Sequence, residues 1–152
     1  MFFKKINLFR LLKLFKYKIL RLKDLPEPIA IGLAWGAAVS FTPLLGFHIL
    51  ICFLGTYFMK GNLLAAAAGT VVGNPWTFPI IFFLSYKIGV IFYDNGIINF
   101  EINISFWVQN FDKIFIPTLI GSIPLSILAW IITYKTTKYF LLKNHKYAKK
   151  KN

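Results

Sequence analysis

The fold is decided by residues 26–86, which read PEPIAIGLAWGAAVSFTPLLGFHILICFLGTYFMKGNLLAAAAGTVVGNPWTFPIIFFLSY. After Glu27, the one charged side chain in this stretch is Lys60, so the chain carries two uncharged runs, 28–59 and 61–86. A hydrocarbon core about 30 Å thick is crossed by roughly 20 apolar residues in a helix that rises about 1.5 Å per residue. Two uncharged runs of this length therefore predict burial in a membrane.

Proline and glycine interrupt both runs near their middle. Pro43 and Gly46 break the first run, and Gly73, Pro75 and Pro79 break the second. The pieces between the breaks are roughly 12 to 18 residues long, and several are too short to cross a bilayer comfortably. Irregular backbone at membrane depth is tolerated only where protein or a water-filled cavity satisfies its polar groups. The two breaks are therefore the places at which we look for function.

The basic residues that give a formal charge of +13 gather at the two ends of the apolar block. Eight lie within residues 4–23, seven lie within residues 135–151, and three lie between. Basic flanks of this kind are cytoplasmic under the positive-inside rule. We therefore expect both termini in the cytoplasm and an even number of crossings, with two and four both open. The placement favours anionic membrane lipids as partners and argues against nucleic acid.

Residues 1–25 combine leucine and other apolar side chains at helical spacing with lysine and arginine around the other side. Charges recur throughout, so the segment lacks the apolar core of a signal peptide. The pattern predicts an amphipathic helix in the membrane interface; a solvated basic tail is the alternative.

Small residues recur at every fourth position immediately before each break. The first stripe is Gly32, Gly36 and Ser40, and the second begins with Ala65 and Gly69 and reaches the break itself at Gly73. In membranes, small residues four apart allow helix backbones to approach closely. We therefore expect the two stripes to pack together.

The sequence offers few groups for catalysis. The five carboxylates lie at the ends of segments, and neither a metal-spaced histidine cluster nor a Ser-His-Asp order occurs. Cys52 is the one cysteine, so an intramolecular disulfide is excluded. An active site needs positioned acids, bases, nucleophiles or metals. We therefore expect no enzyme, and assign no catalytic residue, no metal site and no cofactor.

Four polar side chains lie near the breaks: Thr42, His48, Asn74 and Thr77. Paired, interrupted apolar segments are typical of transporters whose broken helices form a site near the membrane midplane. The four side chains are therefore a candidate polar membrane site. The alternatives are structural: His48 can satisfy a carbonyl freed by Pro43, and Asn74 can cap the helix that begins near Pro75.

The residues around the breaks resemble a known family. The elements that carry the likeness are Pro-x-Ala-x-Gly at 28–32, Thr-Pro-x-x-Gly at 42–46, and Gly-Asn-Pro-Trp-Thr at 73–77 followed by Pro79. In this order they resemble the DUF2062 family of small bacterial membrane proteins, over roughly residues 26–92. The resemblance implies a helical protein of the bacterial inner membrane. It implies no mechanism, because the function of that family is unknown.

The fold class that we expect is all-α, a polytopic membrane bundle of short helices broken by proline and glycine, with an N-terminal amphipathic interfacial helix. The expected function is transport or lipid handling through the paired breaks. The alternative is a non-catalytic scaffold or accessory subunit for an envelope-related protein partner, or an assembly of like copies. The segments predicted are an interfacial helix over 1–25, a broken-helix core over 26–93, an outer connection over 94–113, a transmembrane helix over 114–140, and a basic cytoplasmic tail over 141–152.

Overall fold

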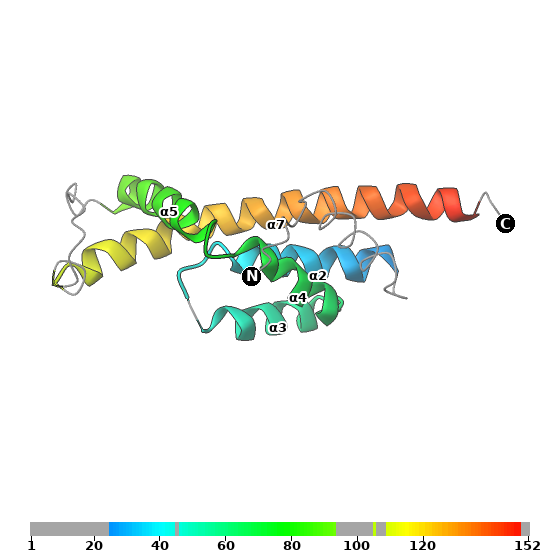
Figure 1. The fold of residues 1–152 in the computed structure, drawn as a ribbon, viewed down its shortest axis with the longest axis horizontal. Helices are drawn as coiled ribbons and strands as arrows, with labels where there is room; N and C mark the ends of the chain where they lie inside the picture. Colours follow the sequence, from blue (N-terminus) through cyan, green and yellow to red (C-terminus); the bar gives the residue numbers. More distant parts are fainter. Residues whose placement is uncertain (1–24, 45, 94–104, 106–108, 150–152) are drawn as a thin grey trace, which may run out of the picture.

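The computed structural model describes residues 25–44, 46–93, 105 and 109–149. The predicted all-helical fold is confirmed over these residues. The predicted interfacial helix over 1–25 and most of the outer connection over 94–113 lie outside them. The elements, drawn in Figure 1, are α2 (Pro26–Val39), α3 (His48–Phe58), α4 (Leu63–Gly69), the 3-10 turn η1 (Thr70–Val72), α5 (Phe78–Phe92) and α7 (Phe111–Lys149).

The first helix of the core, α2, begins where its sequence predicts a helix start. Leu25 is extended, as the residue before a proline prefers, and prolines occupy the first turn, where their missing N–H groups are not needed. The acidic Glu27 lies in the same turn, at the positive end of the helix dipole. Almost every residue from Ile29 to Ser40 is buried, so α2 is the centre of the bundle.

The longest helix, α7, runs from Phe111 to Lys149 and contains Pro117 and Pro124. Figure 1 shows a change of direction between its yellow and orange parts, the region that holds both prolines. The helix does not stop at residue 140, where the sequence suggested that a basic tail begins. Residues 125–149 contain neither glycine nor proline, and lysine is a good helix former, so nothing ends the helix there.

Residues 111–143 of α7 form the one helix in the described ranges that is long and apolar enough to cross a membrane by length and composition. Both α2 and α5 contact α7, α4 packs on α2, and α3 lies outermost against α2 and α4. In Figure 1, α5 lies beside the N-terminal part of α7 and α2 lies beside its later part.

Candidate functional site

The first break begins where α2 ends at Ser40. The Ser40 hydroxyl donates to the carbonyl of Gly36 at 2.9 Å, and the Thr42 hydroxyl donates to the carbonyl of Val39 at 2.7 Å. Both hydroxyls therefore bond to the last turn of α2. Beyond Pro43, Gly46 has a positive φ of 94°, a conformation that side chains rarely adopt.

His48 opens α3 on the far side of this break. The ring nitrogen Nδ1 of His48 accepts a hydrogen bond from the backbone N–H of Gly46 at 3.3 Å. The side chain is half-buried. His48 thus bonds to the break itself, although to an amide rather than to the carbonyl that the structural alternative for this residue named.

The second break is organised by Asn74 and Thr77. The side-chain oxygen of Asn74 accepts from the backbone N–H groups of Trp76 and Thr77 at 3.0 and 3.1 Å. The Thr77 hydroxyl donates to the carbonyl of Val72 at 2.6 Å and accepts from the backbone N–H of Asn74 at 3.0 Å. These bonds form a turn that leads into α5. The two side chains thus hold the turn together by local bonds to backbone, while Thr77, the N-cap of α5, makes no side-chain capping bond to that helix.

This turn separates α4 from α5. The helix α4 ends at Gly69 and continues only as the 3-10 turn η1, and α5 begins at Phe78, whose backbone N–H donates to the carbonyl of Asn74 at 2.9 Å.

The two breaks meet in space. The Ser40 hydroxyl also reaches the carbonyl of Thr70 at 3.4 Å, across from α2 to η1. A Cβ atom added at Gly73 would lie 2.8 Å from Cβ of Ser40 and 3.4 Å from the ring of Phe78. The end of α2, the end of η1 and the start of α5 therefore form one junction, defined by Ser40, Thr70, Gly73 and Phe78.

The small-residue stripes bring the helices to this junction. A Cβ added at Gly36 would overlap the carbonyl of Ala66 and lie 2.7 Å from Cα of Gly69, and one added at Gly32 would overlap the carbonyl of Asn62. Ala65 and Gly69 are buried in this contact. The stripes of α2 and α4 therefore pack backbone against backbone, because no larger side chain fits between them.

The four candidate polar residues are brought together only in part. Asn74 and Thr77 share one turn, whereas Thr42 and His48 bond within the first break. In the part of the chain that the structure describes, no hydrogen bond joins one pair to the other. Each of the four side chains already bonds to nearby backbone, Thr42 to the last turn of α2 and the other three at or beside their own break.

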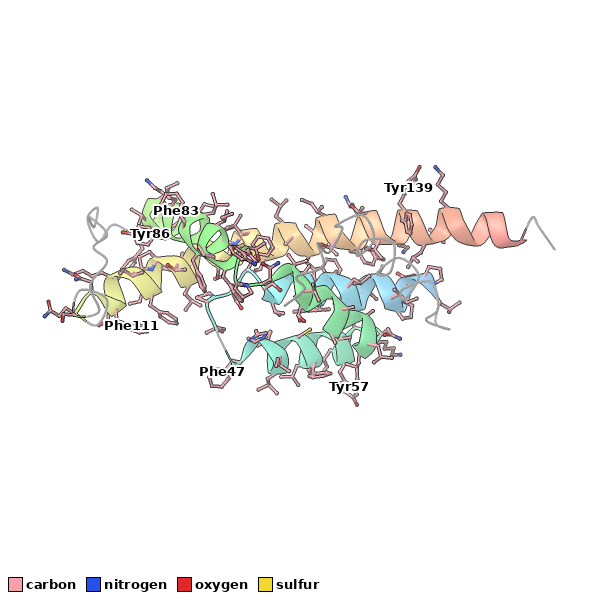
Figure 2. All side chains as sticks on the ribbon, viewed as in Figure 1. Phe47, Tyr57, Phe83, Tyr86, Phe111 and Tyr139 are labelled. Atoms are coloured by element: carbon pink, nitrogen blue, oxygen red, sulfur yellow. The ribbon has the colours of Figure 1, made fainter. Side chains whose placement is uncertain are left out.

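The surface around the breaks is apolar. Phe47 is 65% exposed, Trp76 is 87% exposed and Ile80 is 63% exposed. Figure 2 shows Phe47 and Tyr57 at the two ends of α3, pointing away from the other helices. These large apolar side chains would face water in a soluble protein, where contiguous apolar patches of this kind are rare.

Sequence reasoning missed a second close helix crossing, between α5 and α7. A Cβ added at Gly89 would overlap the carbonyl of Pro117, and one added at Gly121 would overlap the carbonyl of Ser85. The hydroxyl of Ser85 is fully buried and has no hydrogen-bond partner among the described residues. The signal was present, because Ser85 and Gly89, like Pro117 and Gly121, lie four positions apart.

Sequence reasoning also missed the bonds between α2 and α7 at Glu27. A carboxylate oxygen of Glu27 accepts from the Tyr134 hydroxyl at 2.8 Å and from the Lys138 ammonium at 3.0 Å. The hydrogen bond from Lys138, followed by that from Tyr134, lowers the pKa of Glu27 below its ordinary value. Tyr134 and Lys138 lie 107 and 111 positions after Glu27 in the sequence. No local sequence pattern links residues so far apart, so only the fold could reveal this contact.

Metal ligands do not gather in the described ranges, where no three His, Cys, Asp or Glu side chains lie close enough together to hold an ion. The arrangement is thus a packed helix junction whose polar side chains bond to nearby backbone and whose surface is apolar.

Comparison with known proteins supports the family likeness. A family model described as an uncharacterized protein conserved in bacteria (DUF2062) matches residues 9–150. The match extends well beyond residues 26–92, on which the resemblance was recognised. Neither a curated protein nor a solved structure matches the chain. Because the model covers almost the whole sequence, the chain belongs to the DUF2062 family of bacterial proteins.

Proposed function

We propose that this protein is an integral protein of the bacterial inner membrane that binds and moves lipid at the junction of its two helix breaks. Membrane insertion is supported by the uncharged runs, the one membrane-length helix among the described residues, and the exposed apolar side chains of α3 and α5. Basic residues at both ends support cytoplasmic termini and contact with anionic lipid. Nucleic acid is not a partner in this proposal.

The observation that carries the function is the meeting of the breaks under an apolar surface. Interrupted helices that meet inside a bundle are a recurring way to build a membrane substrate site. A water-soluble solute would need a polar path to such a site. Here Phe47, Trp76 and Ile80 flank the breaks and are exposed, so the junction is reached from the hydrocarbon rather than from water. A lipid fits that access.

The chemistry in this proposal is non-catalytic. Lipid movement needs a local opening of the packed helices and a place for the headgroup to pass. The short pieces of η1 and the capped turn at Asn74 are held by a few side-chain bonds, and such segments open at low free-energy cost.

The experiment compares two asparagines whose side-chain oxygens both accept from backbone N–H groups. Asn74 accepts from Trp76 and Thr77 in the turn before α5, at the junction, and Asn62 caps α4 by accepting from the N–H of Ala65 at 2.7 Å, away from the junction. Each Asn→Ala change removes these local bonds and costs about 1 kcal/mol. The purified protein is placed in vesicles with a fluorescent phospholipid, and transfer between leaflets is followed by quenching from outside.

We expect the wild-type chain and Asn62→Ala to move the phospholipid, and Asn74→Ala to change the rate several-fold. Absence of any transfer by the wild-type chain contradicts the proposed function.

A second candidate is a membrane scaffold that holds a protein partner or a second copy. It is favoured by the hydrogen bonds of Thr42, Asn74 and Thr77, which all go to backbone nearby in the sequence, as a purely structural break requires. The scaffold reading predicts vesicles without lipid transfer and a partner that co-purifies with the wild-type chain and with both asparagine variants.

A further inference from the structure

Two contacts fix the direction of α3 and α4 relative to α2. At one end, the N–H of Asn62 donates to the carbonyl of Pro28 at 2.8 Å, so the turn between α3 and α4 lies beside the start of α2. At the other end, Gly73 lies against Ser40, where α2 finishes. Consequently α2 and α4 run parallel to each other. The helix α3 runs in the opposite direction, from the level of the end of α2 back to the level of its start.

Contacts with the long helix α7 give the positions and directions of α2 and α5. The start of α2 lies beside Tyr134 and Lys138, through the bonds of Glu27. On α5, Ser85 lies against Gly121 and Gly89 lies further toward the start of α7, against Pro117. Both α2 and α5 are therefore antiparallel to α7, and they lie along different parts of it, with the breaks between them (Figure 1).

The helix lengths match half of a bilayer. With 11 residues, α3 is about 16 Å long, and the hydrocarbon core is about 30 Å thick. The decapeptide of α4 and η1 is of similar length. Each of these pieces is long enough for one leaflet, whereas the apolar part of α7 is long enough for both.

From these placements we infer that α2 and α3 form a re-entrant hairpin, which enters from the cytoplasmic side, turns near the bilayer midplane and returns to the same side. The full crossings are then two: one made by α4, η1 and α5 in series, and one made by α7. This topology rests on the membrane insertion in the proposed function and is independent of lipid movement.

The exposed side chains on the outer face of α3 indicate which part of the membrane surrounds the hairpin. Its exposed side chains are Phe47, Ile49, Leu50, Phe53, Leu54, Tyr57 and Phe58. The aromatic pair Tyr57 and Phe58 stands next to the exposed Lys60, at the end that lies beside the start of α2. Aromatic and basic residues together are typical of the headgroup level. The acyl chains of the cytoplasmic leaflet therefore cover α3, with Lys60 among the headgroups.

The opposite end of the bundle has its own interfacial residues. Tyr93 is the C-cap of α5, and Asp112 and Lys113 lie in the first turn of α7. Lys87 lies on α5 between Ser85 and Gly89, with its ammonium 5.6 Å from the centre of the Phe83 ring. The four-carbon stem of Lys87 lets the charge run along the exposed helix surface toward the headgroups.

The tip of the hairpin is the position that distinguishes two crossings from four. Four crossings would place Phe47 at the outer surface, a re-entrant hairpin places it near the midplane, and a hairpin lying on the membrane places it at the cytoplasmic surface. The Phe47 side chain is exposed on the protein surface, so a label at this position senses the medium around the protein.

The experiment uses the full chain in vesicles, with Cys52→Ala as background and a nitroxide on Phe47→Cys, Lys60→Cys or Asp112→Cys. Collision with oxygen and with a water-soluble nickel chelate gives the depth of each label. We expect high oxygen and low nickel accessibility at position 47, and at least several-fold higher nickel accessibility at positions 60 and 112.

A membrane-impermeant maleimide then assigns the two surface labels to sides. Position 60 should react from the cytoplasmic side and position 112 from the other. A label at position 47 that is shallow, on either side, overturns the hairpin. Carbonate extraction of the same membranes tests insertion separately, so failure of the topology and failure of the membrane assignment give different results.

Discussion

Ser85 and Gly89 lie one turn apart on α5, at the crossing with α7. We expect alanine at these two positions to change the free energy of unfolding in different directions. Ser85→Ala removes a buried hydroxyl that has no partner among the described residues, so the free energy of unfolding should stay equal or rise by up to about 1 kcal/mol. Gly89→Ala pushes a methyl group into the backbone of Pro117 and should cost about 1–3 kcal/mol, although alanine is the better helix former.

Thermal unfolding in detergent micelles, followed by circular dichroism, measures both variants. An equal loss of stability from the two changes would contradict the packing described for this crossing.

The contact between Glu27, Tyr134 and Lys138 should depend on pH. Because the pKa of Glu27 is lowered in the folded chain, its stabilising contribution is present above the ordinary glutamate pKa and is lost as the pH falls through the folded value. The difference in melting temperature between wild type and Glu27→Gln should therefore be constant near neutral pH and vanish in acid. A difference that persists unchanged in acid would show that the charge of Glu27 is not its cause.

Among the elements, the pairing of α2 with α4 offers a matched test on neighbouring residues. Ala66 is buried against α2, and Ala67 is exposed on the same helix. Ala66→Leu should cost about 1–3 kcal/mol by overpacking, whereas Ala67→Leu should change stability by less than about 0.5 kcal/mol. Resistance to proteolysis in detergent ranks the two variants. If Ala67→Leu is the more damaging, α4 packs through another face.

The features that could be predicted from the sequence are those that depend on residues close together in the chain. The stripe of Gly32, Gly36 and Ser40 is a local pattern of spacing four, and its contact with α4 is where that pattern suggests. The end of α7 was missed because lysines signal a cytoplasmic tail and a good helix equally well.

Other features depend on the assembled fold. The small residues Ser85 and Gly89 repeat a pattern that was read only near the breaks, so their crossing with α7 went unnoticed. For the polar residues, spacing predicted proximity to the breaks but not their partners. Thr42 could have pointed into the junction, yet its hydroxyl bonds to α2 itself.

For the whole molecule, the proposed lipid movement requires the junction of the two breaks to open. Ser40 and Gly73 lie on its two sides, and a Cβ at Gly73 would be 2.8 Å from that of Ser40. Cysteines at such positions can form a disulfide after a small separation, since paired Cβ atoms in disulfides are about 3.5–4.5 Å apart. A disulfide there would lock the junction closed.

The most direct measurement is lipid transfer in vesicles by the Ser40→Cys/Gly73→Cys variant in a Cys52→Ala background, before and after reduction. The pair Ser40→Cys/Ala67→Cys is the control. Ala67 is exposed on α4, whereas Gly73 lies against Ser40, so oxidation should not join the two thiols of the control. The account predicts a cross-link in the first pair alone, loss of transfer when it is oxidised, and recovery on reduction. Transfer at the wild-type rate by the fully cross-linked protein would contradict the claim that this junction is the path.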